Sequence, residues 1–280
     1  MINYQEYKPV GYLARYIDRY WSAYSEKSLF LPQENLNPDG TIELIFNFGD
    51  CHTQIQNSVK KTFNGSFVIG VRKQSLYFSH ADKLDLFSVR FKAGGSYPFF
   101  KIPVHTFANG FYGLSDLFGN EFNQLEEQLC EADGMQQRVC LVESCLVKRL
   151  NHNLGEYSFV ENFYKEMTGG GSVNLHKLIS EFNTSYKTLE RRFINVMGLT
   201  PSEVSKIIRF NKALSLMYSY KAKSLTQVAY DSGYYDQSHF NKEFKNLTGY
   251  TPRQFIQEKF TVIRKLQPAL AERLTKSYNF

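Results

Sequence analysis

The C-terminal half of this 280-residue chain contains one sequence pattern twice, and this internal repeat restricts the fold more than any other feature. The first copy starts at Leu175 and the second at Leu225, and their offset grows from 50 to 51 residues across the second turn. The matched positions after the turn are Leu189, Phe193, Gly198, Thr200 and Pro201 in the first copy and Phe240, Phe244, Gly249, Thr251 and Pro252 in the second. Each copy is therefore predicted to be a short helix, a tight turn and a longer helix, which is helix-turn-helix spacing.

Residue types that end and start helices stand at the same places in both copies. Asn183 and Gly233 lie at the predicted turns, and both types tolerate the positive φ that a sharp helix end requires. Gly198 and Gly249 are predicted to end the longer helices in the same way. The next helices are predicted to start with a Thr cap followed by Pro in the first turn, at Thr200-Pro201 and Thr251-Pro252.

A single helix is predicted over residues 201–219, between the two copies. Val204, Ile207 and Leu214 are among its apolar positions. A helix of this length spans about 28 Å at about 1.5 Å per residue. Successive major-groove segments on one face of B-DNA lie about 34 Å apart. A rigid helix of this kind can hold the two longer helices near that spacing.

Each longer helix combines an apolar stripe with faces that suit nucleic acid. The stripe of helix 185–197 is Leu189, Phe193 and Val196, and that of helix 236–247 is Phe240, Phe244 and Leu247. Arg can bind guanine, Gln and Asn can bind adenine, Glu can accept from cytosine, and Lys and Ser suit phosphates. The alternative is that these polar residues form ordinary solvated helix faces. The presence of such a face in both copies of the repeat, at a fixed offset, disfavours this alternative. The predicted DNA contacts are Lys187, Glu190, Arg191, Gln237, Ser238, Asn241, Lys242 and Lys245.

The two halves of the chain differ in charge. Residues 159–280 hold 18 Lys and Arg against 10 Asp and Glu, whereas residues 1–158 hold 15 against 17. A basic C-terminal half indicates a polyanion as its partner.

The N-terminal half has the period of two that is typical of strands. In TIELIFNFGD, Ile42, Leu44 and Phe46 alternate with residues of the other face, and LDLFSVRFK alternates in the same way. Short strands at close spacing, with turn residues at 37–40 and 94–95, favour a small β-barrel or sandwich. After about residue 114 the pattern becomes helical. The stripe Val139, Val142, Leu146 and Leu150 predicts a helix that either covers the barrel or pairs with a copy of itself.

Residues 160–256 resemble the AraC/XylS family of bacterial transcription regulators. The second copy, VAYDSGYYDQSHFNKEFKNLTGYTPRQF, is similar to that family's signature of Ala, Gly-aromatic, Ser-His-Phe, Phe-Lys, Gly and Thr-Pro. The resemblance implies a seven-helix DNA-binding domain whose two recognition helices enter adjacent major grooves. His239 belongs to this signature but lies off the face opposite the core, so we interpret it as a structural residue or a backbone contact. The resemblance assigns base-reading positions to Lys187, Glu190, Arg191, Gln237, Ser238, Asn241 and Lys242.

The N-terminal half is similar to a sensor domain that precedes some of these regulators, through NPDGTIELIFNFGD, FVIGVRKQSL and FSVRFKAGGSYPFF. This resemblance implies a cupin-like β-barrel without an assigned ligand. The predicted fold is therefore α+β: a cupin-like β-barrel with flanking helices, followed by an all-α double helix-turn-helix domain. The predicted boundaries are a sensor or dimerisation domain at 1–150, a linker at 151–157, the DNA-binding domain at 158–257 and a helical extension at 258–280.

A cupin-like barrel raises the alternative of a metal enzyme, for which closely spaced histidines such as HxH are typical. The six histidines, His52, His80, His105, His152, His176 and His239, include no such pair. No GxSxG, phosphate-loop or GxGxxG motif is present. We therefore expect no enzymatic activity, no metal and no cofactor. A module that uses its basic helices to bind another protein is a further alternative.

The remaining expectations concern partners and location. We expect double-stranded DNA as partner, a small-molecule effector in the N-terminal half, and a homodimer formed through the helix that ends at Leu150. RNA polymerase is a further candidate partner. Arg72, Tyr77 and Arg90 are candidate effector contacts, but structural roles are favoured for them. No apolar run approaches the roughly 18 residues of a membrane span, and the N-terminus lacks a signal-peptide pattern, so we expect a cytoplasmic protein.

Overall fold

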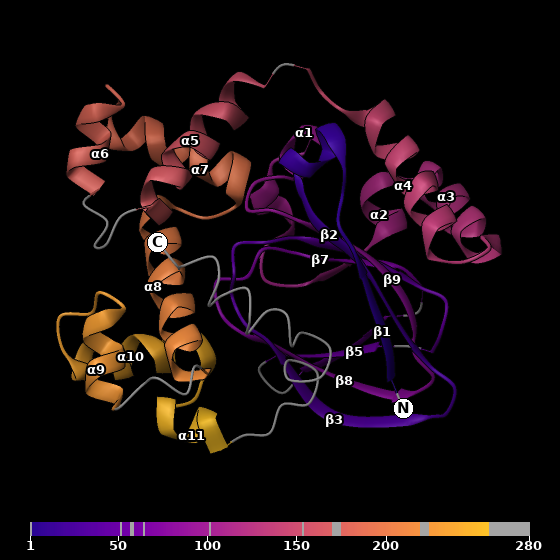
Figure 1. The fold of residues 1–280 in the computed structure, drawn as a ribbon, viewed down its shortest axis with the longest axis horizontal. Helices are drawn as coiled ribbons and strands as arrows, with labels where there is room; N and C mark the ends of the chain where they lie inside the picture. Colours follow the sequence, from indigo (N-terminus) through magenta and orange to yellow (C-terminus); the bar gives the residue numbers. More distant parts are fainter. Residues whose placement is uncertain are drawn as a thin grey trace.

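The computed structural model has a β-rich N-terminal half and a helical C-terminal half (Figure 1). It describes residues 2–50, 52–56, 59–63, 65–100, 102–152, 154–169, 175–218 and 224–257. The predicted helical extension at 258–280 lies outside these residues. Among the helices that the structure describes, none is both long and apolar enough to cross a membrane.

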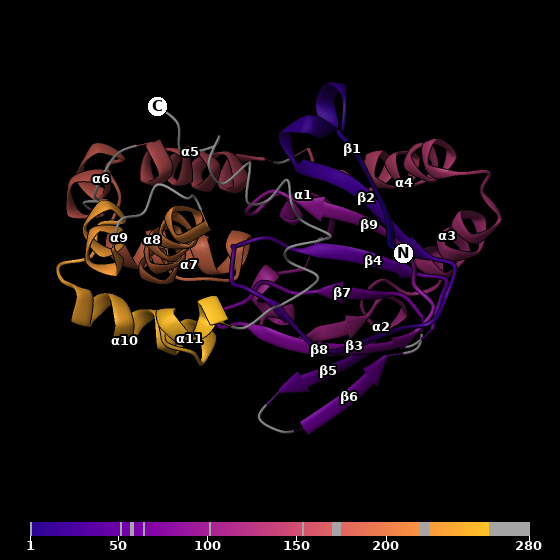
Figure 2. The same cartoon turned by 60° about the horizontal axis from the view of Figure 1, so that its bottom comes forward.

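The strands of the described residues form two antiparallel sheets. The six-stranded sheet has the order β1 (Ile2–Tyr7), β2 (Ile17–Ser25), β9 (Asp85–Phe91), β4 (Glu43–Asn47), β7 (Phe67–Ile69) and β10 (Phe111–Gly113). The four-stranded sheet has the order β3 (Leu29–Leu36), β8 (Leu76–Asp82), β5 (His52–Gln56) and β6 (Val59–Phe63). Figure 2 shows the two sheets one below the other.

The prediction of a cupin-like barrel needs a correction, because the barrel is not closed. A closed barrel pairs its end strands with each other and leaves no edge. Here the described strands fall into two separate sheets, and the end strands β1 and β10 of the larger sheet pair with neither β3 nor β6 of the smaller one. The arrangement is an open sandwich whose inner faces build a core of their own.

The period-two strands divide their side chains between two cores. We call the first the helix-side core, and it includes Leu44 and Phe46 of β4. We call the second the inter-sheet core, and it takes Ile45 of the same strand. All five residues of β4 are buried, because both faces of the strand are covered. The inter-sheet core consists of Ala23, Ile45, Phe63, Phe67, Ile69, Leu76, Leu84, Leu86 and Phe111.

One short helix between β1 and β2 and five helices after β9 pack on the outer face of the larger sheet. They are η1 (Gly11–Arg15), α1 (Tyr97–Phe100), η2 (Val104–Phe107), α2 (Leu114–Phe118), α3 (Asn120–Glu131) and α4 (Met135–Arg149). Val142 and Leu146 of α4 are buried in the helix-side core, and Val139 and Leu150 pack against it. Of the two roles predicted for this helix, the structure therefore supports coverage of the β-rich half. The homodimer stays a prediction, and the apolar stripe of α4 no longer supports it because the β-rich half covers that stripe.

The C-terminal half begins with α5 (Gly155–Gly169), which starts inside the predicted linker 151–157. It continues with α6 (Leu175–Glu181), α7 (Tyr186–Met197), α8 (Pro201–Tyr218), α9 (Leu225–Asp231), α10 (Gln237–Thr248) and α11 (Pro252–Gln257). The helical character of this half is confirmed. The domain boundaries and the family's seven-helix count stay predictions.

The helix-side core extends from the β-rich half into the first helix-turn-helix unit. Leu189, Phe193 and Val196 of α7 belong to it, together with sheet residues such as Phe87 and Val89. The second unit has a separate core around Phe210, Phe240 and Phe244, which we call the second-unit core. The two units are therefore supported differently, although their sequences repeat.

Gly198 lies at the end of α7, beside Val71 and Val104 of the β-rich half. Its φ is +71°, and a Cβ added there would lie 2.6 Å from Cγ1 of Val71 and 3.0 Å from Cγ1 of Val104. Only glycine combines this backbone conformation with this approach.

We expect Gly198→Ala to lower the free energy of unfolding by about 2–4 kcal/mol, because left-handed backbone strain and overpacking add together. Gly249→Ala is the matched control, since Gly249 also ends a helix in the left-handed conformation, with a φ of +78°, but an added Cβ would lie no nearer than 3.9 Å to the Tyr77 hydroxyl. The control should lose only about 1–2 kcal/mol. Urea unfolding of both variants measures the difference, and equal losses would contradict the close contact at Gly198.

Candidate nucleic-acid interface

Side-chain caps fix the start of each recognition helix. Ser185 Oγ accepts a hydrogen bond from the Thr188 amide at 3.2 Å at the start of α7. Asp236 Oδ1 accepts one from the His239 amide at 2.7 Å at the start of α10. Both helices end at a glycine in the left-handed conformation, as the repeat predicts. The repeated sequence signals therefore set the bounds of both helices.

The predicted turns and Thr caps are also confirmed. Asn183 has a φ of 45° and Gly233 a φ of 86°. Thr200 and Glu203 exchange hydrogen bonds, with the Thr200 amide donating to Glu203 Oε2 at 2.8 Å. Thr251 and Gln254 repeat this arrangement. Reciprocal bonds of this kind form a capping box, which satisfies amide groups that a helix start leaves free.

The connecting helix α8 lies between the two recognition helices. In Figure 1 it runs from α7 toward α9 and α10, and it contacts both α7 and α9. Phe210 of α8 packs on Phe244 of α10 with ring centroids 5.2 Å apart. Arg209 of α8 donates to both carboxylate oxygens of Glu243 on α10, at 3.0 and 3.2 Å. The 18 residues of α8 span roughly 27 Å.

The apolar stripes and the polar faces of α7 and α10 lie where the sequence predicts them. The six stripe residues are all buried. Of the predicted DNA contacts, Lys187, Arg191, Ser238, Lys242 and Lys245 are exposed, and Glu190, Gln237 and Asn241 are half-buried. Their contact with DNA stays a prediction.

Two residues of α10 are held by neighbours within the second unit. Gln237 Oε1 accepts a hydrogen bond from Thr226 Oγ1 of α9 at 2.7 Å. The ring of His239 packs edge-on against Tyr234, with centroids 5.5 Å apart, and its Nε2 lies 3.8 Å from Glu243 Oε2. His239 therefore has contacts within the second unit, and its role stays a prediction.

A cleft separates the second recognition helix from the β-rich half. Lys242 and Lys245 of α10, Lys206 of α8 and Lys73 of the β-rich half line it. Lys73 Nζ forms an ion pair with Glu203 Oε1 at 2.9 Å. The β-rich half thus borders the basic face of α10, which the sequence pattern does not predict.

Buried ion pairs within the β-rich half lie next to a hydrogen bond that reaches α8. Arg72 pairs with Asp39 at 2.6 Å, and Arg90 pairs with Asp39 and with Glu43. Burial raises the pKa of Asp39, but the two guanidinium groups outweigh this effect and hold that pKa well below its ordinary value. The adjacent Pro38 carbonyl accepts a hydrogen bond from Asn211 Nδ2 of α8 at 3.1 Å.

The three candidate effector contacts of the sequence analysis have structural roles, as favoured there. Arg72 and Arg90 are buried in the ion pairs above. The Tyr77 hydroxyl donates to the Thr248 carbonyl of α10.

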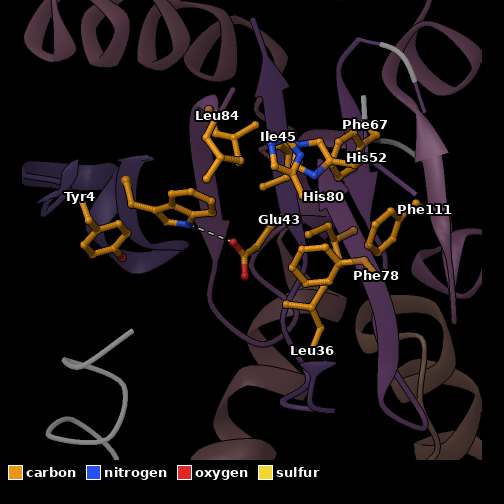
Figure 3. A pocket seen from close by; sticks show the side chains of 13 residues that line it. Tyr4, Leu36, Glu43, Ile45, His52, Phe67, Phe78, His80, Leu84 and Phe111 are labelled. Atoms are coloured by element: carbon orange, nitrogen blue, oxygen red, sulfur yellow. Dashed lines mark hydrogen bonds between the residues drawn. The ribbon is translucent and has the colours of Figure 1, made fainter. Parts of the chain in front are cut away.

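An apolar pocket lies between the two sheets (Figure 3). His52 of β5 and His80 of β8 are opposite each other in the sheet register, with ring centroids 4.5 Å apart. Burial, and secondarily His80, lowers the pKa of His52 to about 3. Sequence spacing could not find this pair, because 28 positions separate the residues and only strand pairing brings them together. Among the described residues, no group of three or more His, Cys, Asp or Glu is placed to hold a metal ion.

Comparisons with known proteins match the helical half and the β-rich half of the chain to two different families. Residues 178–258 match a family described as a helix-turn-helix domain, and residues 5–112 match a domain of unknown function (DUF6597). The HTH-type transcriptional activator RhaS of Escherichia fergusonii is 26% identical over 234 residues, covering 72% of this chain and 80% of RhaS. ToxT of Vibrio cholerae is 13% identical with a TM-score of 0.43, over 83% of this chain and 98% of ToxT. A regulator with an AraC-type DNA-binding domain from Chromobacterium violaceum is 24% identical with a TM-score of 0.34, over 41% of this chain and 99% of its own.

Paired helix-turn-helix units with capped recognition helices define a DNA-binding transcription regulator. The matched domain and the similarity to RhaS narrow this class. The chain is similar to transcription regulators of the AraC family and carries a β-rich domain in front of its helix-turn-helix region.

We expect Asp39→Asn to lower the free energy of unfolding by about 3 kcal/mol at pH 7, because it leaves buried guanidinium charge with weaker partners. The carboxylate contributes stability above its unfolded pKa of 3.8 and loses it as the pH falls toward its lower folded pKa. The difference between wild type and variant should therefore shrink below about pH 4. Urea unfolding at pH 7 and pH 3 tests this, with exposed Asp133→Asn as a control that should change little. A difference that does not vary with pH would contradict the assignment.

We expect Glu243→Ala to destabilise the chain by about 2–3 kcal/mol, because it removes the bidentate pair between α8 and α10. Glu243 is 8% exposed. Glu181→Ala is the matched control, since Glu181 pairs with Lys177 on the exposed surface of α6, where the loss should stay below about 0.5 kcal/mol. Thermal unfolding of both variants measures the contrast, and similar small losses would show that the pair does not hold α10.

Proposed function

We propose that this regulator reads two adjacent major-groove segments of double-stranded DNA by inserting α7 and α10 from one side. The observation that carries the proposal is the pairing of two capped recognition helices at α8, each with its apolar stripe buried and its polar face open. The connecting helix α8, with a length of roughly 27 Å, is somewhat shorter than the repeat of the major groove, which is about 34 Å. A modest bend of the DNA toward the protein would close this gap.

The residues of the two polar faces take different roles in this proposal. Arg191 has the bidentate donor geometry that guanine O6 and N7 accept. Asn241 and the free amide group of Gln237 suit adenine, and Glu190 suits cytosine. Lys187, Ser238, Lys242 and Lys245 suit phosphates or base edges, and their exposure leaves them accessible.

The proposal gives the β-rich half the role of a sensor that acts through direct contact with the DNA-binding half. Three hydrogen bonds support this: Asn211 to the Pro38 carbonyl, the Ser75 amide to the Leu247 carbonyl, and Tyr77 to the Thr248 carbonyl. The last two end on the final turn of α10. A shift of residues 75–77 would therefore move the second recognition helix. A homodimer and a contact with RNA polymerase belong to the same proposal as its further partners.

Arg191→Ala tests base reading by α7. We expect a loss of about 1–3 kcal/mol in binding at the preferred operator and a relaxed base preference at one position. The operator is first obtained by selecting DNA sequences bound by the full-length protein, and titrations with single-base variants of it then measure the preference.

Lys245→Ala is the matched comparison on α10. If Lys245 contacts only phosphate, binding should weaken alike for all sequences, and the slope of log affinity against log salt should flatten by about one. Equal, sequence-independent losses from both variants would remove the role of Arg191 as a base reader. Unfolding curves that match wild type confirm that both variants remain folded.

A further inference from the structure

The pocket between the two sheets has the features of a ligand site rather than of a packing defect. Its walls come from both sheets, and Figure 3 shows their side chains pointing into one common space. Of the thirteen described residues that line it, eight are aliphatic or Phe, and the other five are Tyr4, Trp21, Glu43, His52 and His80. Tyr4, Trp21, Leu36 and Phe78 are half-buried, so the pocket opens to solvent on their side.

His52 has a buried ring nitrogen that is available for a hydrogen bond with a ligand. The side chain is 3% exposed, and its Nε2 is buried without a hydrogen-bond partner among the described residues. A buried polar atom left in this state costs about 1–3 kcal/mol. Because burial keeps the imidazole neutral at pH 7, it can either donate to or accept from a ligand group.

The charges around the pocket exclude a strongly charged ligand. Among the described residues that line the pocket there is no Lys or Arg, so an anion would find no counter-ion among them and would lie near the Glu43 carboxylate. Glu43 is itself engaged: it accepts from Trp21 at 3.0 Å, from Ser88 at 3.3 Å and from Arg90. A cation would therefore compete with a guanidinium that is already in place. Desolvation disfavours either charge in an apolar site.

We propose that this pocket binds a small uncharged apolar molecule whose single hydroxyl or carbonyl group forms a hydrogen bond with His52. The inference rests on the proposed sensor function and deepens it by naming the chemical class of the effector. The cavity measures about 70 Å³, roughly half of the ~150 Å³ cavity that accommodates benzene. A ligand with one ring therefore also displaces the half-buried side chains at the opening.

Occupancy of the pocket has a direct connection to the DNA-binding half. Glu43 lines the pocket and pairs with Arg90, which pairs in turn with Asp39. Pro38, the neighbour of Asp39, accepts the hydrogen bond of Asn211 on α8. A ligand that moves Glu43 would thus act on α8 through two ion pairs and one hydrogen bond.

Trp21 gives a binding assay that needs no knowledge of the natural ligand. It is the single tryptophan of the chain, and it lines the pocket. We expect cyclohexanol and cyclohexanone, added to the full-length protein at pH 7.5, to change its fluorescence saturably. Cyclohexanecarboxylate and cyclohexylammonium have the same ring with a charge, and we expect them to bind at least about tenfold more weakly.

Two further measurements test the role of His52. His52→Phe keeps a ring of similar size but removes the hydrogen bond, and it should weaken cyclohexanol binding about tenfold while methylcyclohexane binding stays unchanged. His105→Phe is the matched control, because His105 is exposed on η2 and does not line the pocket. Nitrogen NMR of the wild-type imidazoles needs no variant, and cyclohexanol should shift the His52 Nε2 resonance.

Several results would overturn the proposal: no saturable fluorescence change with either neutral probe, binding of a charged analogue as tight as that of cyclohexanol, or an unmoved His52 resonance. These measurements contain no DNA, so their failure leaves the proposed groove reading intact. Conversely, failure of the Arg191 test leaves the pocket assignment intact.

Discussion

The architecture of this regulator depends on one apolar core that its two halves build together. The outer face of the six-stranded sheet contributes Phe87 and Val89, and α7 contributes Leu189 and Phe193. Removing such surfaces from water stabilises the fold by about 25 cal/mol per Å², and close packing then resists small displacements. The first recognition helix is therefore held by the β-rich half as well as by its own helical neighbours.

The second recognition helix is supported in another way, and this difference suits a regulated protein. Its stripe packs in the second-unit core around Phe210 and Phe255, and it meets the β-rich half through hydrogen bonds from Ser75 and Tyr77. Single hydrogen bonds contribute only about 1 kcal/mol each, so they are exchanged far more readily than a shared core. In the proposed mechanism α7 is the fixed element and α10 the adjustable one.

The helix-turn-helix region could be predicted in detail because its signals are local. The positive φ of Asn183 and Gly233, the Thr caps and the buried stripes all lie within a few residues of the pattern that indicates them. The sheets were harder to predict. Period-two alternation indicated the strands, yet closure into a barrel depends on which edges pair, and β1 and β10 remain the ends of an open sheet. The helix that ends at Leu150 had two possible partners in sequence terms, and packing selected the β-rich half.

The amino-acid order alone therefore specified the repeat, the bounds of its helices and the side chains that each recognition helix leaves outside the core, because helix periodicity and capping act over fewer than ten residues. It did not specify the pairing of His52 with His80, the ion pairs of Asp39, or the cleft beside α10. Those features join residues from distant parts of the chain. Strand register and inter-domain packing bring such residues together, and both are set by the burial of the whole structure rather than by any short segment.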